Sequence, residues 1–130
     1  MIYVIGLGSN DGDRELHLHN ALNFLARHSD TLYSSTHYES PALGGDSAIS
    51  KPHYLNAVAE IDTDLDADAL NRLLKEMERL EGRDDAARAA GRVPLDADIV
   101  IAGDEIVRPA DFSRYFFRRG YEELRPLLDR

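Results

Sequence analysis

Residues 94–104 predict a buried strand that carries two acidic side chains on one of its faces. An unbroken β-branched run, residues 99–101, follows Asp98, and turn-forming residues come directly after it. Because successive side chains of a strand point to opposite faces, we expect Asp96 and Asp98 to share one face. The other face is then formed by Ala97, Ile99 and Ile101.

Two neighbouring carboxylates on a half-buried strand repel each other and lose hydration, so this pattern indicates a bound cation. The chain contains no cysteine. A site built from oxygen ligands favours Mg²⁺, which often accompanies substrate phosphates. The pattern also allows a pair of metal ions bridged by both carboxylates, as in many phosphoryl-transfer sites.

The same acidic pattern occurs a second time in a different context. Asp66 and Asp68 precede leucine and methionine residues at helical spacing. There we expect Asp66 to be the N-cap of a helix and Asp68 to be a first-turn acid favoured by the helix dipole. The pattern is therefore weak evidence by itself, and only the strand context makes Asp96 and Asp98 candidate metal ligands.

Composition limits the class of protein. With 130 residues, 43% of them hydrophobic, the chain is expected to form one compact domain over residues 1–130. Its net charge of −9 argues against nucleic-acid or anionic-membrane partners. The start of the chain lacks a secretory signal, and no apolar run approaches the roughly 20 residues of a membrane span. We expect a soluble, cytoplasmic protein with small-molecule partners, and the sequence specifies no oligomeric state.

The predicted elements follow the order strand, helix, strand, strand, helix, strand. This is the order of the ferredoxin-like α+β fold, an antiparallel sheet with two helices on one face. His17 and His19 lie two residues apart on the first helix, so they cannot act together as ligands and are expected to face solvent. The strands are expected at residues 2–7, 31–38, 53–61 and 96–101, and the helices after Asp11 or Asp13 and at residues 66–81.

The sheet face opposite the helices is expected to be open to a ligand. In the third strand an apolar set alternates with Tyr54 and Asn56, which should therefore lie on the open face beside Asp96 and Asp98. The long loop at residues 39–52 has no hydrophobic period and is a candidate rim or lid. The apolar set that should face the core is Leu55, Ala57, Ala59 and Ile61.

Five short motifs follow one another along the chain. They are Gly8-Ser9-Asn10, Tyr38-x-x-Pro41-x-Leu43-Gly44, Tyr54-Leu55-Asn56-Ala57, Glu78 with Gly82-Arg83, and Leu95-Asp96-x-Asp98-Ile99. Each is weak alone, but their order and spacing over residues 1–107 resemble the hydroxymethyldihydropterin pyrophosphokinase family. The resemblance implies a ferredoxin-like fold and transfer of pyrophosphate from ATP to the hydroxymethyl group of a reduced pterin, an early step of folate biosynthesis.

The resemblance also implies roles for the matching residues. Asp96 and Asp98 would bind two Mg²⁺ ions that bridge the ATP phosphates. Tyr54 and Tyr121, which stands where the family has Phe, would enclose the pterin ring, as suits aromatic faces and a flat heterocycle. The pterin edge would be bound by Asn56, by Ser40 and by the backbone near Leu43. The implied nucleotide-binding residues are Glu78, Arg83, Arg88, Arg92, Ile99 and Arg119, with Arg83 and Arg92 also catalytic.

The loop before the acidic strand differs from the family pattern, so the chain resembles a short, diverged member. Residues 83–92 lack the tryptophan of the family and contain Asp84 and Asp85 near positions where cations are expected. Arg92 stands four residues before Asp96, where three are usual. We therefore expect the pterin half of the site to be better kept than the nucleotide half, where lost cations reduce charge stabilisation.

Two alternatives stay open at this point. One is a diverged paralogue that binds a pterin or another flat heterocycle with weak or no transferase activity. The other is an interaction domain whose open sheet face uses Phe116 and Phe117 as a contact surface. The arginines of residues 83–92 can equally form a solvated, salt-bridged loop.

Overall fold

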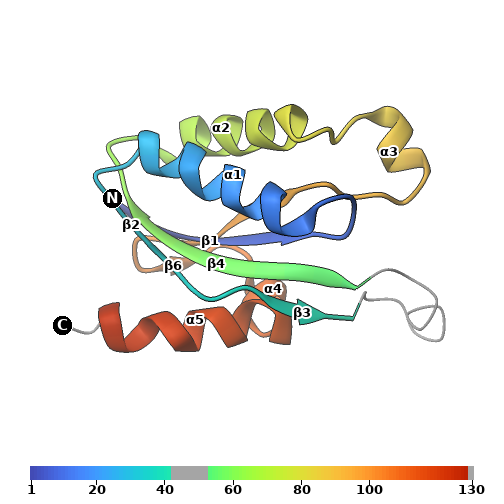
Figure 1. The fold of residues 1–130 in the computed structure, drawn as a ribbon. Coiled ribbons are helices and arrows are strands. Elements are labelled where there is room, and N and C mark those ends of the chain that lie inside the picture. Colours follow the sequence, from blue (N-terminus) through green and yellow to red (C-terminus); the bar gives the residue numbers. More distant parts are fainter. Residues whose placement is uncertain (42–52, 129–130) are drawn as a thin grey trace.

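The computed structural model describes residues 1–41 and 53–128 (Figure 1). The strands are β1 (Ile2–Ser9), β2 (Thr31–Ser34), β3 (Tyr38–Ser40), β4 (Tyr54–Asp62), β5 (Asp96–Ala102) and β6 (Glu105–Ile106). The helices are α1 (Arg14–Arg27), α2 (Ala67–Leu80), α3 (Asp85–Ala89), α4 (Pro109–Phe112) and α5 (Tyr115–Leu128). Within these ranges the strands form one antiparallel sheet of order β2-β4-β1-β5-β6, with β3 also paired to β4.

Helices α1 and α2 cover one face of this sheet (Figure 1). Helix α1 connects β1 to β2, and α2 connects β4 to β5, in each case with one antiparallel strand between them. This topology confirms the predicted ferredoxin-like α+β fold. The predicted alternation of β4 is also confirmed, because its apolar set lies in the core beneath the helices. That set is Leu55, Ala57, Ala59 and Ile61.

An aspartate side chain caps the N-terminus of each of these helices. Asp13 Oδ1 accepts a hydrogen bond of 3.1 Å from the amide of Leu16, and Asp66 Oδ1 accepts one of 2.8 Å from Ala69. The second acidic pattern of the sequence is therefore a helix cap, as predicted. Helix α2 ends before Gly82, whose φ of 102° suits glycine alone among common residues.

His17 joins α1 to the end of α2. Its Nδ1 lies 2.8 Å from Glu81 Oε1, which also accepts a hydrogen bond of 3.1 Å from Asn20. The prediction that His17 faces solvent is wrong, because the helix end that contacts it comes from a distant segment; His19 is exposed as predicted.

The strand predicted at residues 31–38 is interrupted. Ser34 pairs with Ala59 and Tyr38 pairs with Asn56, so four residues on this side advance against three on β4. The extra residue is a bulge, and it reverses which side chains face the sheet surface. The single face predicted for the whole segment is therefore wrong, and Tyr38 is buried while Ser34 is exposed.

A second bulge lies in β5. Val4 of β1 pairs with Ile101 and Ile5 pairs with Ile99, which leaves Val100 as the extra residue. Ile99 packs beneath α1 and α2, whereas Ile101 packs on the opposite face. The prediction that Ile101 shares the face of Ile99 is therefore wrong, because the bulge reverses the alternation after the acidic pair.

Helix α5 covers part of the sheet face that was expected to be open (Figure 1). Its residues pack on a second apolar cluster, so that expectation is wrong for this part of the face. This helix, Tyr115–Leu128, is not among the elements expected from the sequence. Among the described helices, none is long and apolar enough to cross a membrane. The second cluster consists of Val4, Val58, Val100, Ile101, Phe117 and Leu124.

Gly120 is the point of closest approach between α5 and the sheet. A Cβ atom there would lie 2.6 Å from Val58 Cγ2 and 2.8 Å from the Tyr38 hydroxyl. That hydroxyl accepts a hydrogen bond of 3.0 Å from the Gly120 amide and donates one of 2.6 Å to the carbonyl of Phe116. Burial raises the pKa of Tyr38 to about 12, so the hydroxyl keeps the proton that it donates. These contacts fix the N-terminal turns of α5.

Candidate functional site

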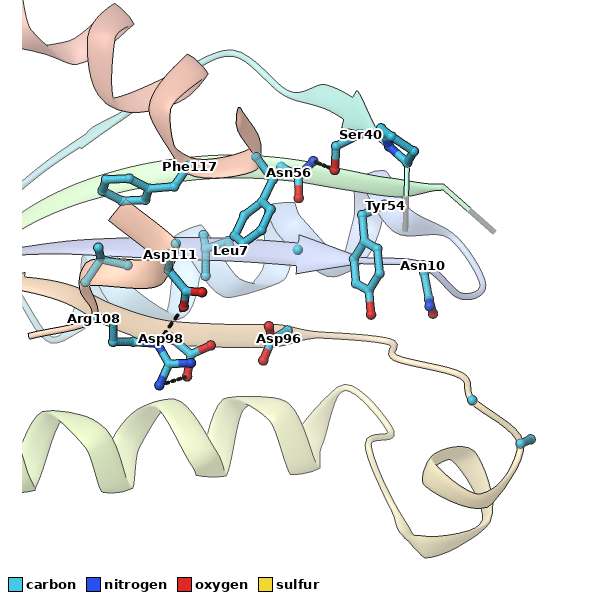
Figure 2. A pocket seen from close by; sticks show the side chains of 17 residues that line it. Leu7, Asn10, Ser40, Tyr54, Asn56, Asp96, Asp98, Arg108, Asp111 and Phe117 are labelled. Carbon is cyan, nitrogen blue, oxygen red and sulfur yellow. Dashed lines mark hydrogen bonds and ion pairs between the residues drawn. The ribbon is translucent and has the colours of Figure 1, made fainter. Parts of the chain in front are cut away.

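A cavity of about 650 Å³ lies on the sheet face that α5 partly covers, beside the N-terminal end of that helix (Figure 2). Strands β1, β3, β4 and β5 line it, together with the connections before β5 and after β6. The structure brings together some of the polar and aromatic residues that the sequence predicted for a ligand site. Five of them line this cavity: Ser40, Tyr54, Asn56, Asp96 and Asp98.

Two glycines of β1 make room for the cavity. Gly6 pairs with Asp98 and Gly8 pairs with Asp96, so both glycines lie directly beside the acidic residues. A Cβ atom at Gly8 would stand 3.3 Å from Tyr54 Cδ2 and 3.3 Å from the side-chain oxygen of Asn56. A side chain at either glycine would therefore enter the space between the acidic pair and the residues of β4.

The two aspartates lie near one edge of the sheet. Strand β6 pairs only with Ile101 and Ala102 of β5, so the part of β5 that holds Asp96 and Asp98 has no described strand on its outer side. Both carboxylates are partly exposed toward the cavity (Figure 2). Shared exposure on one face confirms the strand geometry predicted for this pair.

A buried glutamate of α2 holds this edge in place. Glu78 Oε2 accepts a hydrogen bond of 2.9 Å from the amide of Ala97 and lies 3.0 Å from Arg83 Nη1. The same Arg83 nitrogen donates to Asp96 Oδ1 at 3.0 Å. Glu78 is 5% exposed, and its buried carboxylate is paired with Arg83 and with Lys75, which lies 3.3 Å away. Arg83 therefore links the helix to the first aspartate.

Asp98 carries charge that the protein neutralises only in part. Burial and the neighbouring Asp96 carboxylate raise the pKa of Asp98 to about 6. Arg108 Nη1 and Lys75 Nζ each lie 3.9 Å from Asp98 Oδ1, too far for hydrogen bonds. A half-buried carboxylate in this state gains stability from a cation bound beside it.

The polar side chains at the other end of the cavity are already oriented. The Asn56 amide nitrogen donates to Ser40 Oγ at 2.8 Å and to the carbonyl of Tyr38 at 3.2 Å. Both Asn56 and Ser40 are buried. With its nitrogen held by the protein, Asn56 presents its side-chain oxygen beside Gly8, where it can accept a hydrogen bond from a ligand.

Tyr54 is half-buried and stands between these polar groups and the acidic pair (Figure 2). Burial, and secondarily the charge of Asp96, raise the pKa of its hydroxyl. The hydroxyl therefore stays protonated at neutral pH, and the ring gives the cavity one flat aromatic wall.

Tyr121 does not line the cavity with the other predicted residues. Its ring stacks on Phe117 with centroids 5.4 Å apart and contacts Phe112 at 5.5 Å. The aromatic residues of α5 that do line the cavity are Phe116 and Phe117. Tyr121 lies one helical turn beyond Phe117 on the same side of α5, and so farther from the N-terminal end of the helix that borders the cavity.

The remaining predicted cations lie outside the cavity. Arg88 pairs with Asp85 at 3.0 Å, and Arg92 lies 3.6 Å from Asp11. Arg119 lies over the ring of Tyr38 at 5.4 Å. The Ile99 side chain is in the core, which leaves only its backbone near the acidic pair, and Leu43 lies outside the described residues.

Three lining residues with polar or charged side chains were not predicted as site residues: Asn10, Arg108 and Asp111. Asn10 lay in the first motif, and its side-chain oxygen accepts a hydrogen bond of 2.6 Å from the amide of Val93, which ties the two loops at this end of the cavity. Arg108 and Asp111 follow β6 without any motif, so only the folded chain reveals that they reach the site.

Comparison with known proteins identifies the family of this chain. The model of the family described as 7,8-dihydro-6-hydroxymethylpterin-pyrophosphokinase matches residues 4–126. The chain belongs to this family. Tyr54, Asn56 and the two aspartates, which belong to the motifs that carried the resemblance, line one cavity.

Individual relatives carry the same family name. A Haemophilus influenzae protein named 2-amino-4-hydroxy-6-hydroxymethyldihydropteridine pyrophosphokinase is 36% identical over 80% of this chain and 64% of its own length. An Aquifex aeolicus protein of the same name is 33% identical over 80% of this chain and 62% of its own. The mitochondrial folate synthesis bifunctional protein of Pisum sativum is 36% identical over 97% of this chain and 24% of its own length. The chain thus spans a little under two thirds of the bacterial relatives.

Proposed function

We propose that this protein transfers the pyrophosphoryl group of ATP to the hydroxymethyl group of a reduced pterin. The observation that carries the proposal is the juxtaposition, in one cavity, of the Asp96–Asp98 pair with the ring of Tyr54 and the amide of Asn56. One end suits a metal-bound polyphosphate, and the other suits a flat heterocycle with a hydrogen-bonding edge.

The reaction needs no nucleophile from the protein. The hydroxyl oxygen of the pterin attacks the β-phosphorus of ATP and forms a new P–O bond. The bond between this phosphorus and the oxygen that bridges it to the α-phosphate breaks, and AMP leaves with the electron pair. The hydroxyl proton is released to water. The protein therefore contributes positioning and charge stabilisation.

The pterin is proposed to bind between β4 and the first turns of α5. Tyr54 provides one aromatic wall, Asn56 Oδ1 accepts from the pterin edge, and Ser40 orients the Asn56 amide. For the second wall the resemblance names Tyr121, whereas Phe116 is the half-buried aromatic residue of α5 at the cavity. We propose Phe116 for this role, with Tyr121 supporting the aromatic cluster behind it.

Asp96 and Asp98 are proposed to hold Mg²⁺, as two ions when ATP is bound. The donor set fits, because Mg²⁺ commonly takes one or two carboxylates together with waters and substrate phosphates. The raised pKa of Asp98 also fits, since a half-buried carboxylate beside a second one is stabilised as an anion by a divalent cation. When bound, Mg²⁺ neutralises charge on the polyphosphate.

The nucleotide half is proposed to use fixed and movable groups. Arg83 and Glu78 form the fixed part that holds Asp96 and the backbone of Ala97. Arg88, Arg92 and Arg119 reach the nucleotide only if their surface ion pairs and ring contacts open, which costs little for exposed groups. The backbone beside Ile99 is proposed to border the nucleotide base.

A direct test is pterin-dependent release of AMP from ATP with and without Mg²⁺. We expect activity that requires both the pterin and the metal. Asp96→Ala should abolish transfer while pterin affinity is largely kept, whereas Tyr54→Ala should weaken pterin affinity. Full activity in Asp96→Ala would contradict the metal role. Tight pterin binding without transfer would favour the diverged heterocycle-binding paralogue.

A further inference from the structure

Arg108 places a cation inside the cavity next to the acidic pair. Among the described residues that line the cavity, it is the one with a positively charged side chain, whereas three residues carry carboxylates. Figure 2 shows its guanidinium between Asp98 and Asp111. A ligand that brings additional negative charge to this end of the cavity is therefore attracted to this guanidinium.

The backbone that carries Arg108 is anchored on both sides. The amides of Val107 and Arg108 donate to the carbonyl of Val100 at 2.9 and 3.4 Å, at the bulge of β5. The carbonyl of Arg108 accepts a hydrogen bond of 3.0 Å from the amide of Phe112. The guanidinium therefore projects from a fixed turn, and its reach into the cavity is set by the fold.

Asp111 fixes the orientation of the guanidinium. Arg108 Nε donates to Asp111 Oδ2 at 2.6 Å, whereas Nη1 lies 3.9 Å from Asp98 Oδ1, beyond hydrogen-bond range. Within the described residues, neither Nη atom takes part in a hydrogen bond. Their N–H groups therefore stay available to a ligand, in the planar fork that matches two oxygens of a phosphate.

We propose that the guanidinium of Arg108, oriented by Asp111, binds phosphate oxygens of the nucleotide beside the Asp96–Asp98 pair. This inference rests on the proposed function and names the residue that receives its polyphosphate. Asp111 is a positioning residue, because it acts through Arg108. The loop arginines Arg88 and Arg92 pair outward, so a cation from the segment after β6 takes up the phosphate charge.

The test compares Arg108→Ala with a matched variant, Arg125→Ala. The two arginine side chains are 48% and 50% exposed and both pair with a nearby acid, but Arg125 lies outside the cavity. With Mg²⁺ present, Arg108→Ala should bind α,β-methylene-ATP about 10- to 100-fold more weakly than the parent. Its affinity for hydroxymethylpterin should be unchanged, and Arg125→Ala should match the parent for both ligands.

Two further variants test the orientation. Arg108→Lys keeps the charge without the fork and should recover part of the nucleotide affinity. Asp111→Ala should raise the KM for ATP. Asp111→Asn keeps an acceptor oxygen for Arg108 Nε, so its KM for ATP should stay close to that of the parent. A merely structural role of Asp111 would instead lower pterin and nucleotide affinity together.

The possible failures are distinguishable. If the parent protein neither binds the analogue nor releases AMP, the proposed function is wrong and the inference falls with it. If the parent is active and Arg108→Ala binds the analogue as tightly as Arg125→Ala does, the assignment of Arg108 is wrong and the proposed function stands. Equal loss of pterin and nucleotide affinity in Arg108→Ala would also overturn the assignment.

Discussion

The carboxylate of Glu78 accepts a hydrogen bond of 2.9 Å from the backbone amide of Ala97, the residue that separates the two aspartates of the site. A buried side chain of α2 thus fixes the strand segment that carries the acidic pair. Since Arg83 lies 3.0 Å from both Glu78 and Asp96, the same network sets the position of the first carboxylate.

Removal of Glu78 should therefore damage both stability and the site. Glu78→Ala leaves Arg83 without a buried partner and the Ala97 amide without an acceptor, which should lower the free energy of unfolding by about 3 kcal/mol. Denaturant unfolding measures this loss. Glu78→Gln keeps an acceptor and should cost less. The matched control is Glu76→Ala on the same helix, which removes an exposed pair with Arg79 and should change stability little.

The raised pKa of Asp98 predicts a pH dependence of stability. The pKa is about 6 in the folded state and 3.8 for an unperturbed aspartate. Between these values the folded state binds a proton that the unfolded state lacks, so this group lowers stability as pH rises from about 4 to about 6. Asp98→Asn removes the effect, and at pH 7 it should be more stable than the parent by about 3 kcal/mol.

Unfolding measured at several pH values checks this prediction. The stability difference between Asp98→Asn and the parent should be small near pH 4 and should grow until about pH 6. The exposed Asp104→Asn variant serves as a control and should show no such growth. A difference that is the same at every pH would contradict a raised pKa of Asp98.

Gly120 should tolerate no side chain. In Gly120→Ala the new Cβ would stand 2.6 Å from Val58 Cγ2, so α5 must shift away from the sheet. Overpacking of this kind typically costs about 1–3 kcal/mol, against a gain in helix propensity of about 1 kcal/mol. We expect a net loss of stability and weaker pterin binding, because Phe116 moves with the helix.

A double mutant separates this clash from other effects. Val58→Ala removes the methyl group nearest to the new Cβ atom, so the loss in the double variant should be smaller than the sum of the single losses. Additive losses, measured by denaturant unfolding, would show that the close approach of Gly120 and Val58 does not limit the packing of α5.

Phe116 and Tyr121 should have different roles. Phe116→Ala removes a cavity wall and should weaken pterin binding about tenfold, with a smaller effect on unfolding. Tyr121→Ala removes a ring that packs on Phe117 and Phe112 and should mainly lower stability. Tyr121→Phe keeps the packing and should resemble the parent. Loss of pterin binding in Tyr121→Ala at unchanged stability would show that Tyr121, and not Phe116, forms the second aromatic wall.

The sequence predicts those features of the fold that local pattern determines. The alternation of β4, the cap at Asp66 and the shared face of Asp96 and Asp98 each depend on spacing within one element. The extra residue at Val100 and the interruption after Ser34 carry no such signal, because a bulge is set by pairing with a distant strand. Pattern therefore predicted the strands and the two helices of the ferredoxin-like fold, mispredicted the faces beyond each bulge and did not predict helix α5.

The same distinction applies to the site. Tyr54 and Asn56 were predicted because both lie on one strand face. The salt-bridged loop that the sequence left open is found at Arg88, which pairs with Asp85, although mixed charges in a loop did not allow the partner to be chosen from sequence. Arg108 enters the cavity only because the turn after β6 is anchored at the β5 bulge, which is a tertiary relationship.

The most direct test of the central claim is calorimetric titration with hydroxymethylpterin, alone and in the presence of Mg²⁺ and α,β-methylene-ATP. A cavity that holds both substrates together predicts pterin binding that becomes tighter when the metal and the nucleotide analogue are present, with heat that depends on Tyr54. Pterin binding that is indifferent to nucleotide and metal would contradict the pyrophosphokinase account, and absence of pterin binding would contradict the assignment of the cavity itself.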